Sequence, residues 1–179
     1  LDTEHTTSKV RTFIWQGVIA MISPHEPLEF PDDRQDAFNA IRPLIGYGPE
    51  SMYVTYNRFY VPDLAHVEKR NASPDRSHNE TFDSLAITGI LGFLAWQALY
   101  GALFFYGFRW LGVLRSKNDR IVFFAMVIGI GVISAAFFWV WLGAEFVGVA
   151  FPFGELAGLM AYLAYFAMFS RSADQQTAS

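Results

Sequence analysis

The second half of the chain is almost continuously apolar, whereas the first half alternates between short apolar and polar stretches. Three apolar runs, at about residues 85–108, 121–141 and 147–169, meet the length of about 20 residues that a helix needs to cross a bilayer. The pattern predicts an all-α membrane protein with a three-helix transmembrane region over residues 84–179. Residues 1–83 are predicted to form a separate region of short helices and loops outside the membrane.

The N-terminal region contains several shorter predicted elements. Residues 1–9 are polar and are expected to be irregular, and the apolar run 12–22 is too short to span a membrane. That run is expected to form a helix that lies either at the membrane interface or against the transmembrane bundle. Residues 24–50 contain five prolines and are expected to be loops, with a short helix at 32–41. The aromatic residues of 51–60 recur at helical spacing and predict another short helix.

Charge divides the chain in the same way as hydropathy. The first 83 residues hold 8 of the 13 Lys and Arg and 13 of the 17 Asp and Glu, which leaves 5 and 4 for the other 96 residues. The loop 109–120 carries four basic residues and one acidic residue, whereas the loop 142–155 carries only two glutamates. Basic loops stay in the cytoplasm. The loop 109–120 and the C-terminus, which Arg171 precedes, are therefore predicted to be cytoplasmic, and residues 1–83 extracytoplasmic.

Composition excludes several classes of site. The chain has no cysteine, which excludes disulfides, zinc–thiolate sites and cysteine nucleophiles. The four histidines are scattered, so neither a metal nor a cofactor is predicted. No basic patch with interleaved aromatic residues occurs, so nucleic acid is not an expected partner. Because the chain begins at Leu1 without signal-peptide character, we expect it to be the C-terminal part, or a processed product, of a longer multi-span protein.

Small residues and a proline mark positions of interest within the predicted spans. Gly129 and Gly131 in the second span permit close approach of another helix. Pro152 and Gly154 are candidate positions for a break in the third span.

The boundary between the two regions places titratable residues directly before an apolar helix. His78 and Asn79 precede the run that begins near Leu85. The imidazole of His78 can accept or donate a proton near neutral pH, and a surface or capping histidine is the alternative interpretation. Asn79 is a candidate N-cap, and Glu80 and Asp83 suit the positive end of the helix dipole.

The N-terminal region also supplies cations that could bind an anionic substrate. They are Arg11, Arg58, Lys69, Arg70 and Arg76. Arginine binds a diphosphate in a bidentate manner that lysine cannot reproduce. Arg11 heads the apolar run that contains Trp15, which predicts a place near the lipid interface. A snorkelling or ion-paired arginine is the alternative interpretation.

A glycine-containing loop at residues 43–50 is a further candidate. Gly46 and Gly48 flank Tyr47 and allow backbone conformations that side chains forbid. The loop is either an ordinary turn or a tight loop that approaches a ligand closely.

Taken in order, three stretches resemble the C-terminal half of the O-antigen ligase and O-antigen polymerase superfamily. They are Arg11-Thr-Phe-Ile-Trp15 with the apolar run to Ile22, Pro43-Leu-Ile-Gly-Tyr-Gly-Pro-Glu50 with the aromatics after it, and His78-Asn79 followed by Phe82, Gly89 and Gly92. In the family, the histidine is followed by Ser or Asn, by an apolar residue four positions after it and by Gly eleven after it. This chain has Phe82 where Leu is usual, and the resemblance covers roughly residues 9–168.

The resemblance implies a metal-independent, inverting glycosyltransferase in the bacterial cytoplasmic (inner) membrane. The donor would be a glycan on polyprenyl diphosphate, and the acceptor a hydroxyl at the outer face. Carried over to this chain, the catalytic residues are His78 as the base, Arg11 as a diphosphate ligand and Arg76 as a helper. Three further residues would bind substrate: Asn79, Tyr47 and Glu50.

This chain departs from the family in length, because family members have many more spans than the three predicted here. The expected partners are therefore membrane lipid, the polyprenyl-diphosphate-linked glycan, and other membrane subunits or a missing N-terminal half. A second hypothesis follows from the same departure. The chain would then be a non-catalytic accessory subunit whose three spans and outer region pack against a larger membrane complex.

Overall fold

The fold is entirely helical over the part of the chain that the structure describes. In the computed structural model this part comprises residues 3–30, 32–68 and 72–177, with side chains described from residue 7 to residue 169 within those ranges. It contains no strand, only one isolated bridge between Glu29 and Gln35. Lys69, Arg70 and the side chain of Arg171 lie outside the described residues. The predicted all-α class is confirmed.

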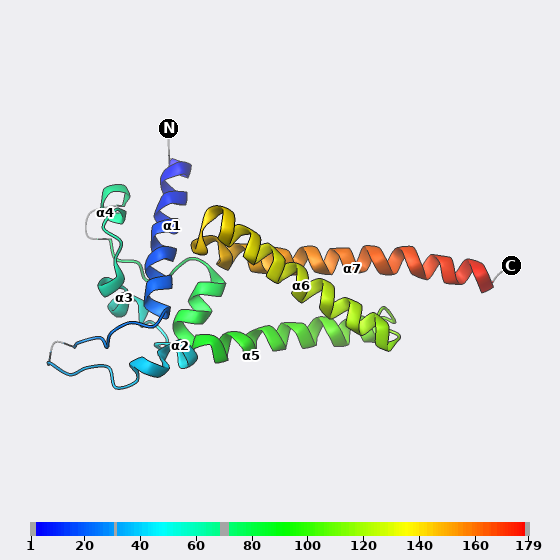
Figure 1. The fold of residues 1–179 in the computed structure, drawn as a ribbon, viewed down its shortest axis with the longest axis horizontal. Helices are drawn as coiled ribbons and strands as arrows, with labels where there is room; N and C mark the ends of the chain where they lie inside the picture. The colour runs from blue at the N-terminus through cyan, green and yellow to red at the C-terminus, as the bar shows by residue number, and fades with distance from the viewer. Residues whose placement is uncertain (1–2, 31, 69–71, 178–179) are drawn as a thin grey trace. The chain divides into compact units, whose positions relative to one another are not determined.

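The chain forms two compact units, Leu1–Ala98 and Leu99–Ser179. Among the described residues, three helical segments are long and apolar enough to cross a membrane. They are α5 (Glu80–Trp110), α6 (Lys117–Leu142) and the segment Ala144–Phe169, which holds most of α7 (Val147–Thr177) (Figure 1). By length and composition the three predicted spans are confirmed, and the chain is a membrane protein.

The central helix of the first unit is α1 (Thr3–Ile22). It buries Ile14, Val18 and Met21, which recur at helical spacing and are at most 2% exposed. The prediction that residues 1–9 are irregular is wrong for most of that stretch. Residues 3–9 contain no Gly or Pro. The helix, which the buried residues further along α1 anchor, therefore extends through them.

Among the residues described between α1 and α5, five short helical elements occur. They are η1 (Asn39–Ile41), α2 (Arg42–Ile45), α3 (Met52–Thr55), η2 (Tyr56–Phe59) and α4 (Leu64–Val67). The predicted helix at 51–60 is confirmed as α3 and η2. The Tyr56 side chain is fully buried against α1, where a Cβ atom on Gly17 would lie 2.6 Å from its ring and its hydroxyl oxygen. Gly17 therefore allows η2 to approach α1 closely, and burial raises the pKa of Tyr56.

The predicted helix at 32–41 is wrong over most of its length, because only its last three residues are helical. A tight turn precedes them. The backbone N–H of Phe30 donates to the carbonyl of Arg34, and Asp33 has a φ of 59°. Such a left-handed residue cannot belong to a right-handed helix, so the turn delays the start of helical structure.

α5 contains a break at Gly89, which has a φ of 65° and a ψ of −171°. The turns before the break belong to the core of the first unit, where Phe82 and Ala86 are 3% and 1% exposed. After Gly89 the helix runs in a different direction (Figure 1). The break therefore separates a helix that packs in the first unit from the apolar helix that follows.

In the second unit, α6 and α7 pack as a helical hairpin joined by Gly143 and η3 (Ala144–Phe146). The residues 142–155, expected to be a loop, are a loop only around that short connection, so Glu155 lies inside α7. The expected break at Pro152 is absent because α7 continues through it. Glu155 is therefore a carboxylate in the middle of a candidate span.

Glycines let the two helices of the hairpin approach closely. A Cβ atom on Gly154 would lie 2.6 Å from Cβ of Ser134, and one on Gly158 would lie 2.3 Å from the carbonyl oxygen of Met126. The predicted role of Gly131 in close packing is confirmed, whereas Gly129 has no neighbouring atom within 4 Å of such a Cβ. Gly154 is thus a packing position and not a helix break.

An aromatic cluster holds the start of α6 against its neighbours in the second unit. The Phe123 ring lies 5.3 Å from that of Tyr162 in α7 and 5.8 Å from that of Phe108 in α5. The Tyr162 hydroxyl donates to the carbonyl of Val113 at 3.2 Å. Phe105 of α5 also packs against this cluster.

Candidate functional site

The candidate site is the turn that leads into α5, with His78 at its centre. Asn79 is the N-cap of the helix, as predicted: its side-chain oxygen accepts hydrogen bonds from the backbone N–H of Thr81 at 3.0 Å and of Phe82 at 3.2 Å. Glu80 and Asp83 lie in the first turn, where negative charge stabilises a helix. These hydrogen bonds fix Asn79, the residue directly after His78, at the start of the helix.

Ser77 fixes the other side of His78, and its side chain is completely buried. Its backbone N–H donates to Oδ1 of Asp83 at 2.8 Å, and its hydroxyl donates to the carbonyl of Asn79 at 3.0 Å. Its carbonyl accepts from the indole Nε1 of Trp15 in α1 at 2.8 Å. Every polar group of Ser77 is thus satisfied inside the unit, which makes the turn rigid at this residue.

His78 itself has a φ of 56°, and its side chain is exposed to solvent. The left-handed conformation costs a residue with a Cβ atom about 1–2 kcal/mol, although histidine is among the residues that adopt it more often. Ser77 and Asn79 hold the backbone in this conformation from both sides. Strain of this kind collects at functional sites, and here its effect is to present an imidazole to the solvent from a fixed backbone.

The two predicted arginines of the site are both exposed. Arg76 precedes Ser77 in the same turn. Arg11 lies one helical turn before Trp15 in α1, and residues four apart share a face of a helix. Because Trp15 contacts Ser77, the helical spacing places Arg11 on the face of α1 that the His78 turn packs against. His78 and Arg76 thus lie in one turn, and the Trp15–Ser77 hydrogen bond joins that turn to α1 one helical turn after Arg11.

Tyr47 and Glu50, the other predicted substrate-binding residues, lie at the opposite end of the first segment of α5. The backbone N–H of Tyr47 donates to the carbonyl of Ala86 at 2.8 Å, and Ala86 lies about 10 Å along the helix from its first residues. Glu50 is exposed and has a φ of 56°. The loop 43–50 therefore approaches α5 closely, and the hydroxyl of Tyr47 is directed to a different set of partners.

Those partners form a polar network that sequence reasoning missed. The Tyr47 hydroxyl donates to the carbonyl of Met21 at 3.0 Å and lies 2.6 Å from Nε2 of His25. His25 donates from Nδ1 to the carbonyl of Glu26 at 2.6 Å. Burial raises the pKa of Tyr47 to about 12. The sequence held no signal for this network, because its members are far apart along the chain and share no motif.

An ion pair completes the network. Arg42 donates from Nε and Nη2 to the two carboxylate oxygens of Asp36 at 2.7 and 2.9 Å, and its guanidinium lies 5.1 Å from the centre of the Tyr47 ring. The hydrogen bonds from Arg42 hold the pKa of the Asp36 carboxyl below its usual range, and the same pairing raises the pKa of Arg42. The network therefore stabilises the loop and leaves Arg42 without a free face for a ligand.

Within the described part of the chain, no three His, Asp or Glu side chains are grouped closely enough to hold a metal ion. In comparisons with family models, curated proteins and solved structures, nothing matched the chain. The resemblance to O-antigen ligases thus rests on the sequence motifs alone.

Proposed function

We propose that the protein is an O-antigen ligase-like glycosyltransferase of the bacterial cytoplasmic membrane. It transfers a glycan from a polyprenyl-diphosphate donor to an acceptor hydroxyl at the outer face of that membrane. The observation that carries the proposal is the exposed imidazole of His78, which a left-handed backbone presents from the turn that leads into α5, the helix whose part after Gly89 is long and apolar enough to span a membrane. A lipid-linked substrate would reach such a helix from the bilayer.

In the proposed reaction, the neutral imidazole of His78 takes the proton of the acceptor hydroxyl. The hydroxyl oxygen forms a bond to the anomeric carbon while the bond from that carbon to the diphosphate oxygen breaks, with inversion. The bonding electrons leave with the diphosphate, whose charge Arg11 and Arg76 offset. The side chains of Arg11 and Arg76 are both exposed, which supports these roles.

The reaction requires the first unit to lie outside the cytoplasm. The charge of the connection between α5 and α6 supports this orientation, because Arg115, Lys117 and Arg120 lie at or next to it. Single cysteines test it directly, since the chain has none of its own. In intact spheroplasts a membrane-impermeant maleimide should label Asp63→Cys and not Asn118→Cys, and lysis should expose both. The reverse pattern would exclude transfer at the outer face.

The test of the chemistry uses substitutions that keep the backbone of the turn. His78→Asn and His78→Gly both tolerate a positive φ, so they remove the base without added strain. We expect each to lower glycan transfer in membranes from cells that express it by about 100-fold or more, the contribution of a general base. His66→Asn, at an exposed histidine of α4, is the matched control and should retain activity. Full activity in both His78 variants would refute the proposed mechanism.

The second hypothesis, a non-catalytic subunit of a larger membrane complex, has one observation in its favour. Tyr53 and Val54 are adjacent on α3 and are 59% and 70% exposed, an apolar surface that suits a protein partner. Tyr53→Ser with Val54→Ser should then release the chain from such a complex. If the double variant changes nothing while the His78 variants lose activity, the enzyme hypothesis stands alone.

A further inference from the structure

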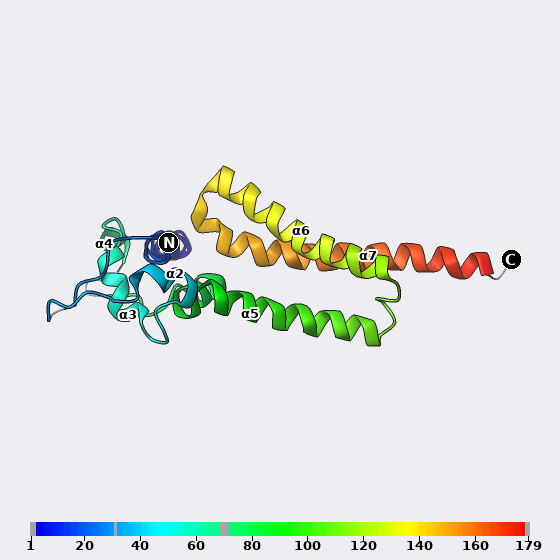
Figure 2. The ribbon, with the colours of Figure 1, turned by 60° about the horizontal axis from the view of Figure 1, so that its bottom comes forward.

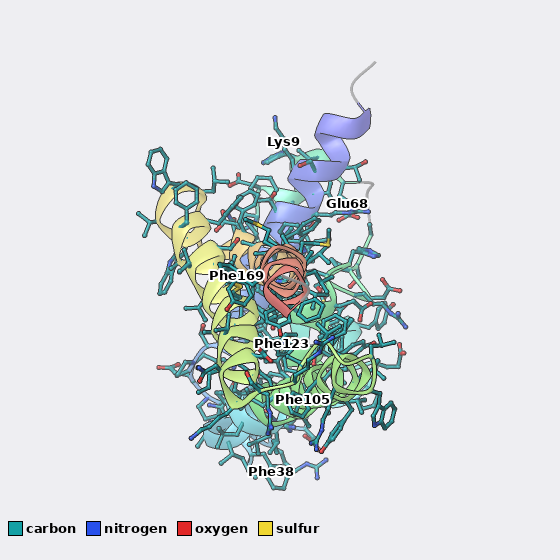
Figure 3. The ribbon with its side chains drawn as sticks, turned by 90° about the vertical axis from the view of Figure 1, so that its right-hand side faces the viewer. Lys9, Phe38, Glu68, Phe105, Phe123 and Phe169 are labelled. Atoms are coloured by element: carbon teal, nitrogen blue, oxygen red, sulfur yellow. The ribbon has the colours of Figure 1, made fainter. Side chains whose placement is uncertain are left out.

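A short apolar surface of the first unit is exposed. Phe38, Ile41, Leu44 and Ile45 are 57%, 42%, 46% and 42% exposed and form what we term the 38–45 patch. They recur at the spacing of one helical face over η1 and α2. Figure 3 shows Phe38 at the edge of the unit, directed away from the ribbon.

The polar residues of the same segment are directed into the unit. Arg42 is paired with Asp36, and its Nη1 also donates to the carbonyl of Gly46 at 3.1 Å. The Nδ2 of Asn39 donates to the carbonyl of His25 at 2.7 Å. The segment thus turns its polar side inward and its apolar side outward, the opposite of a surface helix in a water-soluble protein. Its outer face suits apolar surroundings.

The patch is fixed at a defined position along α5. The backbone N–H groups of Tyr47 and Gly48 donate to the carbonyls of Ala86 and Ile87 at 2.8 and 2.9 Å. A Cβ atom on Gly89 would lie 2.3 Å from the carbonyl of Leu44, a member of the patch. Both Figure 1 and Figure 2 show α2 beside the point at which α5 changes direction. The patch therefore lies at the level of the helix break.

The length of the uncharged helix that follows the break matches the thickness of a bilayer. The 19 residues from Ile90 to Phe108 contain no charged side chain, and Arg109 follows them. At 1.5 Å per residue these residues extend about 28 Å, close to the thickness of about 30 Å of the hydrocarbon core. When Ile90–Phe108 fills that core, Gly89 lies at its surface, and so does the patch that is held against it.

We propose that the 38–45 patch inserts into the boundary between the lipid headgroups and the acyl chains of the bilayer that α5 spans. The occupant of the patch is lipid, because Leu44 packs against the break in α5 and exposed apolar residues of α5 follow that break, with Leu91 and Leu94 57% and 54% exposed. Arg42 is engaged by Asp36, so the patch itself offers no cation to an anionic headgroup. Insertion is driven by apolar burial and does not depend on lipid charge.

The test places a nitroxide label on single cysteines of the whole chain, reconstituted in phosphatidylcholine vesicles. Leu44→Cys and Ile41→Cys report on the patch. Val54→Cys, an exposed apolar residue of α3 in the same unit, is the matched control. We expect the patch labels to be several-fold less accessible to a water-soluble nickel chelate than the label at 54, and more accessible to oxygen. Addition of phosphatidylglycerol should leave the difference unchanged.

Two outcomes would overturn the proposal. Equal accessibility of the labels at 44 and 54 to the nickel chelate would show that the patch is in water. Protection that disappears as the protein is diluted with lipid would show that a second copy of the chain covers the patch. Neither result depends on glycan transfer, so the outcome is independent of the proposed enzymatic activity.

Discussion

Gly46 and Gly89 lie backbone to backbone: a Cβ atom on Gly46 would be 2.6 Å from the nitrogen of Gly89. Both have positive φ, at 70° and 65°. The contact joins the loop 43–50 to the break in α5. Close packing of two backbone segments therefore accounts for the presence of Gly46 and Gly89 in the sequence motifs, and approach to a ligand is not needed to explain them.

Gly46→Ala and Gly89→Ala should therefore each destabilise the protein strongly. The added Cβ atom meets backbone atoms and the positive φ becomes strained, so we expect a loss of about 2–5 kcal/mol of unfolding free energy for each. Gly48→Ala separates the backbone strain from the steric clash, because Gly48 has a φ of 98° but open space around it. It should cost about 1–2 kcal/mol. Unfolding in detergent micelles measures all three, and equal losses would contradict the packing argument.

Trp15→Phe should loosen the His78 turn. The substitution keeps an aromatic ring near Phe82 but removes the indole donor to the carbonyl of Ser77. We expect a loss of about 1–2 kcal/mol and faster amide hydrogen exchange at residues 77–80. The control is Trp110→Phe, since Trp110 is 84% exposed and its replacement should have little effect. Unchanged exchange at the turn in Trp15→Phe would show that the indole does not hold it.

The Asp36–Arg42 pair should make stability depend on pH. Because the pKa of Asp36 is lowered on folding, its contribution is complete above the ordinary carboxyl pKa of about 4 and is lost as pH falls through the lower folded value. Asp36→Asn should cost about 3 kcal/mol at neutral pH, as Arg42 then lacks its partner. The difference from the unsubstituted protein should shrink below about pH 4.

Thermal unfolding at a series of pH values measures this dependence. Asp33→Asn is the matched control, because Asp33 is an exposed carboxylate of the same loop and asparagine tolerates its positive φ. A difference between Asp36→Asn and the unsubstituted protein that stays constant through the acid range would contradict the linkage.

Two glycines of the α6–α7 hairpin should respond to alanine with opposite signs. In Gly158→Ala the new methyl group meets the Met126 carbonyl, so we expect a loss of about 1–3 kcal/mol. In Gly129→Ala it meets open space, and the higher helix propensity of alanine should be neutral or stabilising by up to about 1 kcal/mol. Unfolding in micelles compares them, and a destabilised Gly129→Ala would show that a partner covers this face of α6.

The elements predicted correctly are those specified by local sequence. The mean hydropathy of about 20 consecutive residues, the number that crosses a bilayer, is sufficient to locate the spans. A polar residue before an apolar run is sufficient to identify Asn79 as the N-cap. The misjudged elements depend on tertiary contacts. The N-terminal extension of α1 follows from the buried face further along the helix, and the place of Glu155 follows from an interhelical turn shorter than expected.

The candidate site was predicted in its composition and not in its conformation. The order of residues was enough to single out His78 beside a helix start, but nothing local specifies its positive φ. That conformation requires Ser77 to be buried under Trp15, a residue 62 positions away in the sequence. The role of Tyr47 was missed for the same reason, because its hydrogen-bond partners come from α1 and from the turn after it.

The break in α5 also bears on biogenesis. In an unbroken helix the carbonyls of Ala86 and Ile87 would accept from amides of the following turn, yet here their donors are Tyr47 and Gly48. Ribosomes synthesise the donors before the acceptors, so these two hydrogen bonds can form only after the first turns of α5 have been made. The loop 43–50 and the break in α5 therefore complete their structure together, late in the synthesis of the first unit.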